Sequence, residues 1–311
     1  MQNKKQFVIG VDAGGTKTEA ALADLSGTVI KTAKAGPASL RANGIKASCR
    51  GVADAVAKVM PKEKNAAVAS TFIGFPAFAE EYRTKKREIL KELAKNSRIK
   101  KIFSGCVGIG SDQAVAFRAG TDAKDGIAAI AGTGCVVHGW NGAKEVKVSG
   151  WGWLSNEGSG FWIGKEAFLA ILKSHDGRGE GTALTKMVFE KFRLKNIDAL
   201  MAFAYKDPLR NLPLLSIICN EAAKTGDRVA QAILREAGQE IACSVGTAAR
   251  QLGFSNGAKI PLVLVGGTFK SKFFLDAVVA DVSNCGIKFA IIKPNLPALG
   301  AAKIALDNIN G

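Results

Sequence analysis

The sequence lacks long apolar runs. No stretch approaches the roughly 20 apolar residues that a membrane-spanning helix needs, and the N-terminal run at 7–11 ends at Asp12, too short for the core of a signal peptide. We therefore expect a cytoplasmic protein with no membrane partner. The six cysteines form no CxxC pair and no close pairing with histidine, which argues against a zinc site and, in a reducing compartment, against disulfides.

Acidic residues are few relative to basic ones. The chain has 43 lysines and arginines against 27 aspartates and glutamates, which gives a formal net charge of +16. A basic surface can attract nucleic acid, but it can equally steer anionic substrates such as ATP. The basic side chains are dispersed, aromatic residues make up only 7% of the chain, and nothing resembles a nucleic-acid-binding motif. We therefore expect no nucleic-acid partner.

Two common phosphate-binding fingerprints are also missing. A Walker A loop ends in glycine and lysine followed by serine or threonine, but Gly15 is followed by Thr16 and Lys17. A dinucleotide-binding GxGxxG is absent because Val137 stands where the third glycine would follow the turn at 132–134. These absences exclude a P-loop protein and leave a dinucleotide fold without its fingerprint.

The sequence does contain two glycine-threonine turns, each between two apolar, strand-like runs. The first is DAGGTKT at 12–18 and the second is AGTG at 131–134. Glycines let the backbone approach an anion closely and turn its N–H groups toward it. Asp12 could hold a hydrated Mg²⁺ beside the same phosphates. Either turn alone is typical of an ordinary tight turn, but the two together predict an ATP-using phosphotransferase.

The hydrophobic pattern predicts an α/β protein made of two similar halves. In the first half we expect strands at 7–11, 19–25, 28–35, 66–72 and 101–103, and helices at 47–60, 84–96 and 112–119. In the second half we expect strands at 127–131, 135–140, 144–148 and 262–265, and a long helix at 227–252. The order of elements begins again, which indicates an internal duplication. Two such lobes would leave a cleft into which both glycine turns open.

Four motifs resemble one known family. They lie at 7–18, 130–134, 150–164 and 263–271. In this order they are similar to the N-acetylglucosamine kinase branch of the acetate kinase/sugar kinase/Hsp70/actin superfamily, which is grouped with the BadF/BadG/BcrA/BcrD ATPases. The resemblance covers nearly the whole chain. It implies an α/β fold of two ribonuclease-H-like, actin-like ATPase lobes with a central cleft, one at 1–117 plus 297–311 and the other at 118–296.

The resemblance also implies an ATP site built from three segments. The two glycine turns would match the family's two phosphate segments, and 266–271 would match its adenosine segment. The implied ATP contacts are Asp12, Gly14, Gly15, Thr16, Lys17, Gly132, Thr133, Gly134, Gly266, Gly267, Lys270 and Ser271. We expect ATP and Mg²⁺ as cofactors, with Asp12 holding the metal through water.

Phosphoryl transfer to a hydroxyl also needs a carboxylate that accepts the hydroxyl proton. Asp112 is the predicted catalytic base. It stands where the run at 108–111 gives way to the helix at 113–119, and this spacing alone favours an ordinary N-cap aspartate. The stretch Ser-Asp-Gln-Ala that contains it matches the Asn-Asp-Ala segment of the family, and the resemblance therefore implies the catalytic role.

The acceptor site departs from the family pattern at three positions. Ser39 stands in the sugar-binding loop at 36–44 where an asparagine is usual, Asn156 replaces an aspartate, and Cys135 replaces a serine. An asparagine has no charge and offers one acceptor and one donor group, so an anionic acceptor would suit it better than a neutral hexosamine. The residues expected to contact the acceptor are Ser39, Asn43, Asp112, Cys135, Asn156 and Glu157.

Aromatic residues gather near the acceptor segment. Trp151, Trp153, Phe161 and Trp162 surround Glu157 in the sequence. They could stack on the face of a sugar or pack the interface between lobes, and packing is the favoured interpretation.

The favoured function is transfer of the γ-phosphate of ATP to a hydroxyl of an amino sugar, N-acetylglucosamine or glucosamine. A kinase of another sugar or of a sugar acid such as 2-keto-3-deoxygluconate is the first alternative. A reductase-activating ATPase of the BadF type is the second, although the cysteine spacing does not favour a shared iron-sulfur cluster. A non-enzymatic nucleotide-dependent binder is the third, and Asp112 argues against it. The resemblance also leaves room for a homodimer.

Overall fold

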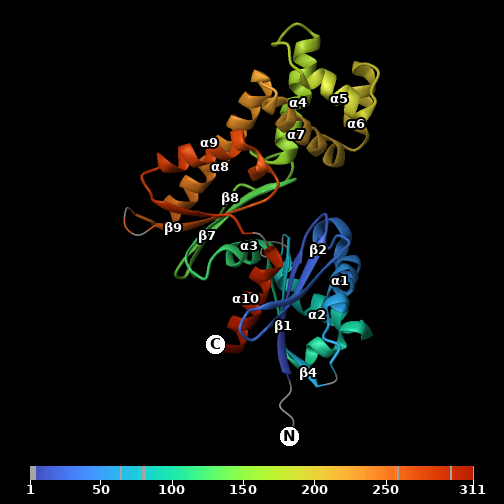
Figure 1. Cartoon of the computed structure of the whole chain (residues 1–311), viewed down its shortest axis with the longest axis vertical. Coiled ribbons are helices and arrows are strands. Elements are labelled where there is room, and N and C mark those ends of the chain that lie inside the picture. The colour runs from blue at the N-terminus through green and yellow to red at the C-terminus, as the bar shows by residue number, and fades with distance from the viewer. Residues whose placement is uncertain are drawn as a thin grey trace. The chain divides into compact units, whose positions relative to one another are not determined.

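The computed structural model describes residues 5–63, 65–76, 78, 82–255, 257, 259–294 and 296–310 (Figure 1). It divides into two compact units, an N-terminal unit within Met1–Ala123 and Lys293–Gly311 and a C-terminal unit within Lys124–Ile292. Each unit contains one five-stranded sheet with helices, which confirms the predicted α/β class. No helix among the described residues is long and apolar enough to span a membrane.

The sheet of the N-terminal unit has the strand order β3-β2-β1-β4-β5. Its strands are β1 (Lys5–Ala13), β2 (Thr18–Asp24), β3 (Val29–Ala35), β4 (Ala66–Phe75) and β5 (Cys106–Ser111). Adjacent strands among β1, β2 and β3 pair antiparallel, whereas β4 is parallel to β1 and β5 is parallel to β4. The α-helices are α1 (Leu40–Val59), α2 (Lys86–Ala94), α3 (Asp112–Gly120) and α10 (Pro297–Asn310), with short 3₁₀ segments at Arg83–Lys85 and Ser97–Ser104.

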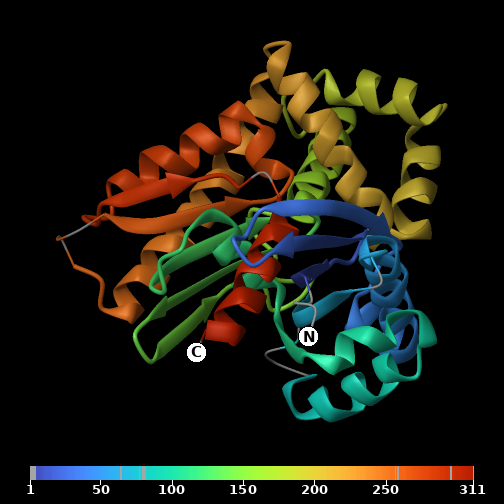
Figure 2. The same ribbon diagram turned by 60° about the horizontal axis from the view of Figure 1, so that its bottom comes forward.

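Helix α10 brings the C-terminal end of the chain back onto the first sheet, as Figure 2 shows. A small apolar cluster joins them, in which Ala301 and Ala302 of α10 pack with Val8 of β1 and Phe72 of β4. The approach is very close, because a Cβ on Gly10 would lie 2.1 Å from the backbone nitrogen of Ala302. A glycine at the centre of β1 is therefore what lets α10 cover this face.

The strand predicted at 101–103 is wrong. These residues lie in the 3₁₀ segment Ser97–Ser104, and the fifth strand of the sheet is β5. Two glycines in β5 face the ring of Phe72, and a Cβ on Gly110 would lie 2.5 Å from its Cζ atom. Because Phe72 fills this space in place of side chains from β5, the strand has little apolar signal of its own.

The sheet of the C-terminal unit has the strand order β10-β9-β6-β7-β8. Its strands are β6 (Gly126–Ala131), β7 (Cys135–Asn141), β8 (Lys144–Val148), β9 (Ile260–Val265) and β10 (Phe289–Ile292). The helices are α4 (Gly160–His175), α5 (Leu184–Phe192), α6 (Ile197–Lys206), α7 (Pro208–Lys224), α8 (Arg228–Leu252) and α9 (Lys272–Ser283), with a 3₁₀ turn at Thr268–Lys270. Helices α8 and α9 pack on each other beside the sheet, and α4 packs on α7 (Figure 1).

The two sheets repeat one topology. Each begins with a three-stranded antiparallel meander, and in each the fourth and fifth strands add in parallel on the side of the first strand. Each glycine-threonine turn joins the first and second strands of its sheet, β1 to β2 and β6 to β7. The repeated strand order confirms the internal duplication that the element order indicated.

Candidate functional site

The first glycine turn is closed by its own backbone. The amide of Gly14 donates to the carbonyl oxygen of Lys17 at 2.9 Å, and a Cβ on Gly14 would lie 2.8 Å from that oxygen. At Gly15, by contrast, a Cβ would meet no described atom within 4 Å. Gly14 is thus required for the shape of the turn, whereas Gly15 leaves open space above its backbone, as an approaching phosphate would need.

Two carboxylates lie side by side at this turn. Asp12 and Glu19 are partners in the β1–β2 register, and the Oε1 atom of Glu19 lies 2.8 Å from Nζ of Lys17 and 3.3 Å from Nζ of Lys34. Burial opposes ionisation of Glu19, but hydrogen bonds from both lysines lower the pKa of this carboxyl. Glu19 is a residue that the sequence interpretation missed, because its role depends on a cross-strand neighbour.

Asp12 has the opposite electrostatic balance. Burial and then the charge of Glu19 raise the pKa of Asp12 to about 6, with Lys17 opposing them. A cation beside Asp12 would favour its ionised form. The described residues contain no group of three or more histidine, cysteine, aspartate or glutamate side chains that could hold a metal. The buried carboxylate of Asp12 is itself a ligand that fits Mg²⁺, which commonly takes one or two protein carboxylates and fills its remaining positions with phosphate oxygens and water.

The predicted sugar loop is tied to the same turn. Thr18 Oγ1 donates to the carbonyl oxygen of Gly36 at 2.8 Å, and the amide of Ala38 donates to the carbonyl oxygen of Gly14 at 2.9 Å. These bonds hold the start of the loop against the turn, so that a ligand contacting one would lie close to the other.

Ser39 and Asn43 have a local structural role in this loop. Ser39 is the N-cap of α1, where its Oγ accepts from the amide of Ala42 at 3.3 Å. Its own amide donates to Oδ1 of Asn43 at 3.1 Å. The two bonds form a reciprocal cap that fixes the helix start. Contact of either residue with an acceptor stays a prediction.

Asp112 is the first residue of α3, and it is not the N-cap. The cap is Ser111, whose Oγ accepts from the amide of Ala114 at 3.2 Å. Capping of the helix, which is the ordinary explanation for an aspartate at this point of the sequence, is therefore the role of Ser111 and not of Asp112.

The sheet register brings Asp12 and Asp112 to one edge. Asp12 of β1 pairs with Gly74 of β4, and Gly74 pairs with Gly110 of β5, two residues before Asp112. A Cβ on Gly74 would lie 3.3 Å from Cα of Asp112, so the glycine lets α3 begin close to β4. One intervening strand separates β1 from β5, which sets the two strands about 10 Å apart. Gly74 is a second residue that sequence interpretation missed.

In the C-terminal unit, the second glycine turn lies against the start of α4. The amide of Gly132 donates to the carbonyl oxygen of Gly134 at 2.8 Å and closes the turn. The amides of Gly160 and Phe161 donate to the carbonyl oxygens of Gly132 and Thr133 at 2.7 and 3.1 Å. These bonds turn the carbonyls toward α4, and a Cβ on Gly132 would meet no described atom within 4 Å.

Cys135 and Asn156, two of the departures from the family pattern, contact each other. The amide of Cys135 donates to Oδ1 of Asn156 at 2.8 Å, and the thiol of Cys135 donates to the carbonyl oxygen of Glu157 at 3.0 Å. Burial raises the pKa of Cys135 to about 12, so its thiol stays protonated and able to donate. The pair fastens the second turn to the acceptor segment. Glu157 is half-buried, with Oε2 at 3.5 Å from Oγ of Ser155.

The third predicted ATP segment follows β9 and reaches the same turn. Gly266 has a φ of 127°, and a Cβ there would lie 1.9 Å from the carbonyl oxygen of Ala131. Thr268 Oγ1 donates to that oxygen at 2.7 Å. A Cβ on Gly267 would meet no described atom within 4 Å. Gly266 therefore fixes the contact between segments, and Gly267 leaves open space.

Ser271 and Lys270 end this segment at the start of α9. Ser271 is only 4% exposed, and among the described residues its Oγ has no hydrogen-bond partner. The side chain of Ser271 does not cap α9, although it occupies the N-cap position. Lys270 is exposed to solvent. A buried hydroxyl without a partner at this point fits a residue that bonds to a ligand.

The predicted residues thus form one group in each unit. In the N-terminal unit these are Asp12, Gly14, Gly15, Thr16, Lys17, Ser39, Asn43 and Asp112. In the C-terminal unit these are Gly132, Thr133, Gly134, Cys135, Asn156, Glu157, Gly266, Gly267, Lys270 and Ser271. Within each group, backbone register or hydrogen bonds connect segments that are far apart in the sequence.

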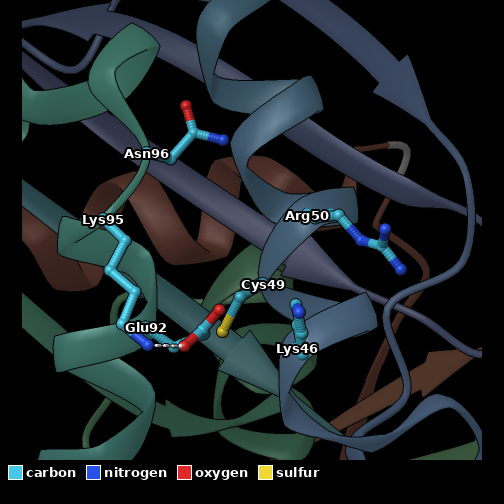
Figure 3. A pocket seen from close by; sticks show the side chains of 6 residues that line it. All are labelled: Lys46, Cys49, Arg50, Glu92, Lys95 and Asn96. Carbon is cyan, nitrogen blue, oxygen red and sulfur yellow. Dashed lines mark hydrogen bonds and ion pairs between the residues drawn. The ribbon is translucent and has the colours of Figure 1, made fainter.

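A small basic cavity lies elsewhere, between α1 and α2 (Figure 3). It measures about 180 Å³ and is lined by Lys46, Cys49, Arg50, Glu92, Lys95 and Asn96. Nζ of Lys95 is bonded to Oε2 of Glu92 at 2.6 Å, and burial raises the pKa of Cys49 to about 12. The cavity contains none of the predicted site residues, and its thiol is neutral at physiological pH.

Comparisons with known proteins agree on one relationship. A match to the BadF/BadG/BcrA/BcrD ATPase family spans residues 9–305. The N-acetylmuramic acid/N-acetylglucosamine kinase of Clostridium acetobutylicum is 27% identical over 274 residues, which cover 87% of this chain and 88% of that protein. The N-acetyl-D-glucosamine kinase of Dictyostelium discoideum is 28% identical in an alignment of 324 positions, gaps included, which covers 98% of this chain and 99% of that protein.

A solved structure shows the same fold. It is a Chromobacterium violaceum protein provisionally named N-acetylglucosamine kinase, which superimposes with a TM-score of 0.75 at 23% identity. The superposition covers 96% of this chain and 98% of that one. The two-lobed α/β architecture therefore extends over nearly the full length of both proteins.

Proposed function

Because the chain belongs to the BadF/BadG/BcrA/BcrD ATPase family, we propose that it is a kinase that transfers the γ-phosphate of ATP to a hydroxyl of an amino sugar. The family match over residues 9–305 confirms the resemblance that the four motifs predicted. N-acetylglucosamine is the proposed first acceptor, because both curated relatives carry that sugar in their names and match most of this chain. We also propose a cytoplasmic location, because ATP is supplied there. A homodimer stays a prediction.

One observation carries the proposed chemistry: Asp12 and Asp112 lie at the same sheet edge with Gly74 between their strands. Asp112 accepts the proton of the attacking hydroxyl, which makes the oxygen a better nucleophile. Asp12 would hold Mg²⁺, which would neutralise charge on the phosphate oxygens. These separate roles need two carboxylates at one edge of the sheet, and the strand register places Asp12 and Asp112 there.

Three glycines support the ATP contacts. Gly15, Gly132 and Gly267 each have open space where a side chain would begin. Backbone N–H groups at such positions can approach phosphate oxygens closely. The proposal assigns the two turns to the phosphates and the segment with Gly267 to the adenosine. Closure of the two units around ATP and acceptor, which would exclude water from the transfer, is part of the proposal.

The bond between Cys135 and Asn156 bears on the acceptor. Oδ1 of Asn156 accepts from the amide of Cys135, which gives this side chain a structural role. The carboxylate of an aspartate could accept the same bond, so the contact does not choose between a neutral amino sugar and a sugar acid, and the experiment tests both.

The test is an ADP-release assay over hexoses, hexosamines, their N-acetyl derivatives and sugar acids, with Asp112→Asn as the control variant. We expect N-acetylglucosamine to stimulate ADP release strongly and Asp112→Asn to lower the rate by about 10²–10⁴-fold. Turnover that survives this substitution would remove Asp112 as the base. ADP release that no sugar stimulates would instead support the reductase-activating ATPase or the nucleotide-dependent binder.

A further inference from the structure

A second, larger cavity lies wholly within the C-terminal unit, next to the acceptor segment. Its volume is about 440 Å³, which is within the range of about 300–1,000 Å³ that small-molecule sites occupy. Residues of the segment at 153–157, of α4 and of the α6–α7 corner line it. All of these walls belong to one unit, so the cavity does not depend on how the two units are arranged.

The cavity has a few polar lining residues, and the rest of its lining is apolar or aromatic. Asn156 and Glu157 contribute polar groups from the acceptor segment, and Lys165 adds a cation that is paired with Glu166 at 3.0 Å. The remaining ten lining residues are apolar or aromatic, and five of them are Trp153, Phe161, Trp162, Phe168 and Tyr205. A ligand that fits would have a hydrogen-bonding end at Glu157 and an apolar body.

Two of the aromatic side chains that line the cavity are exposed to solvent. Trp153 is 51% exposed and Tyr205 is 69% exposed, whereas Phe161 is 5% exposed. The ring of Trp153 meets that of Phe161 edge to face at 5.8 Å, which orients the indole. The favoured interpretation from the sequence, that these aromatics pack the interface between lobes, stays a prediction. Large apolar side chains gathered around a hollow mark binding surfaces.

We propose that this cavity binds an apolar, ring-sized substituent carried by the acceptor sugar, whose hydroxyl-bearing ring lies at Glu157. The inference rests on the proposed sugar-kinase function. An N-acetyl group alone is much smaller than the cavity, and the lining offers too few donors to replace the water around a second polar group. Aromatic faces instead stabilise a planar or ring-shaped apolar group by excluding water and by stacking.

The experiment measures binding rather than turnover. Isothermal titration calorimetry of the full chain would compare N-acetylglucosamine with its phenyl α- and β-glycosides and with N-benzoylglucosamine. We expect at least one phenyl derivative to bind about tenfold more tightly than N-acetylglucosamine, a difference of about 1.4 kcal/mol. If none of the three derivatives binds more tightly, the inference is overturned.

Two leucines of α4 provide a matched pair of variants. Leu169 lines the cavity, whereas Leu172 is also half-buried on the same helix but does not line it. Leu169→Trp should fill the cavity and abolish the tenfold gain while leaving N-acetylglucosamine affinity within about twofold. Leu172→Trp should retain the gain. A gain that persists in Leu169→Trp would place the phenyl group elsewhere and overturn the inference.

A second variant decides the matter if Leu169→Trp does not fold. Tyr205 is exposed, so Tyr205→Ala should fold normally, and it should reduce the gain at least threefold by removing one wall. The outcomes also separate this inference from the proposed function. If the protein phosphorylates N-acetylglucosamine but no derivative binds more tightly, only the inference about the cavity is contradicted. If Leu169→Trp abolishes the gain in affinity but no sugar stimulates ADP release, only the proposed kinase function is contradicted.

Discussion

Neighbouring glycines in the predicted ATP site have opposite surroundings. Gly14 and Gly266 each approach a backbone oxygen so closely that a side chain cannot fit, whereas Gly15 and Gly267 face open space. The first kind of glycine shapes the protein, and the second kind leaves room for a ligand. Substitutions at adjacent positions should therefore separate stability from nucleotide binding.

We expect Gly14→Ala and Gly15→Ala to fail in different ways. The Cβ of Gly14→Ala would lie 2.8 Å from the carbonyl oxygen of Lys17, and the free energy of unfolding should fall by about 1–3 kcal/mol. Gly15→Ala should change it by less than about 0.5 kcal/mol but raise the KM for ATP about tenfold, because its methyl group occupies phosphate space. Denaturant unfolding and ATP titrations measure both effects. An unchanged KM in Gly15→Ala would exclude the turn from the phosphate site.

Thiol reactivity reports the bond between Cys135 and the acceptor segment. Burial raises the pKa of Cys135 to about 12 from an ordinary value of 9.0, so at pH 8 its thiol is protonated and a poor nucleophile. Cys106 and Cys243 are exposed, and iodoacetamide should modify them first, with Cys135 reacting at least about tenfold more slowly. Peptide mass spectrometry over time would measure this. Rapid modification of Cys135 in the folded protein would contradict the hydrogen bond.

The same shift has a consequence for stability. Well below pH 9.0 the thiol is neutral in both the folded and the unfolded chain, so its ionisation does not change the free energy of unfolding. As the pH rises from 9.0 toward about 12, only the unfolded chain ionises at this position, and stability decreases. Unfolding midpoints of the wild type and Cys135→Ser should therefore diverge above pH 9.0 and run parallel below it.

At the scale of elements, the sequence predicts those helices and strands that are determined by a local pattern of apolar and turn residues. Both β-hairpins at the glycine turns were predictable because apolar runs flank turn residues, and α8 was predictable from its apolar face. Strand β5 was not, because its glycines accommodate the ring of Phe72, which belongs to another strand. The bond between Cys135 and Asn156 joins positions 21 residues apart, and no local pattern indicates it.

The contact between β4 and α3 gives a prediction at this scale. A Cβ on Gly74 would lie 2.5 Å from Cγ2 of Val115 and 3.3 Å from Cα of Asp112. Gly74→Ala should push the start of α3 outward and lower kcat about tenfold or more, with little change in the KM for ATP. Steady-state kinetics would measure the split between the two constants.

A compensating substitution tests the cause of this effect. Val115→Ala removes the closest obstructing atom, so the double variant should recover part of the lost kcat. Val115→Ala alone is the control, since it opens a small cavity and lowers stability by about 1–3 kcal/mol. If the double variant is as slow as the product of the two single effects, displacement of α3 is not the reason.

At the scale of the whole molecule, the duplicated topology gives each unit one glycine turn, but only the first turn has an acid. Asp12 precedes the glycines of the first turn, whereas Ala131 stands at the start of the second. The proposed metal position therefore belongs to the N-terminal unit, and the second turn can supply only backbone and hydroxyl groups. Duplication followed by such divergence accounts for two similar turns with unequal chemistry.

The net charge of +16 predicts how the whole molecule treats its two proposed substrates, ATP and N-acetylglucosamine. ATP is an anion and N-acetylglucosamine is neutral, so the field of the protein attracts only the nucleotide. Raising potassium chloride from about 0.1 M to about 1 M shortens the Debye length from about 10 Å to about 3 Å. The KM for ATP should then rise about threefold or more, while the KM for the sugar changes by less than about 1.5-fold. Initial rates with either substrate varied give both constants, and a parallel rise in the two would indicate a general effect of salt on the enzyme instead of steering of ATP.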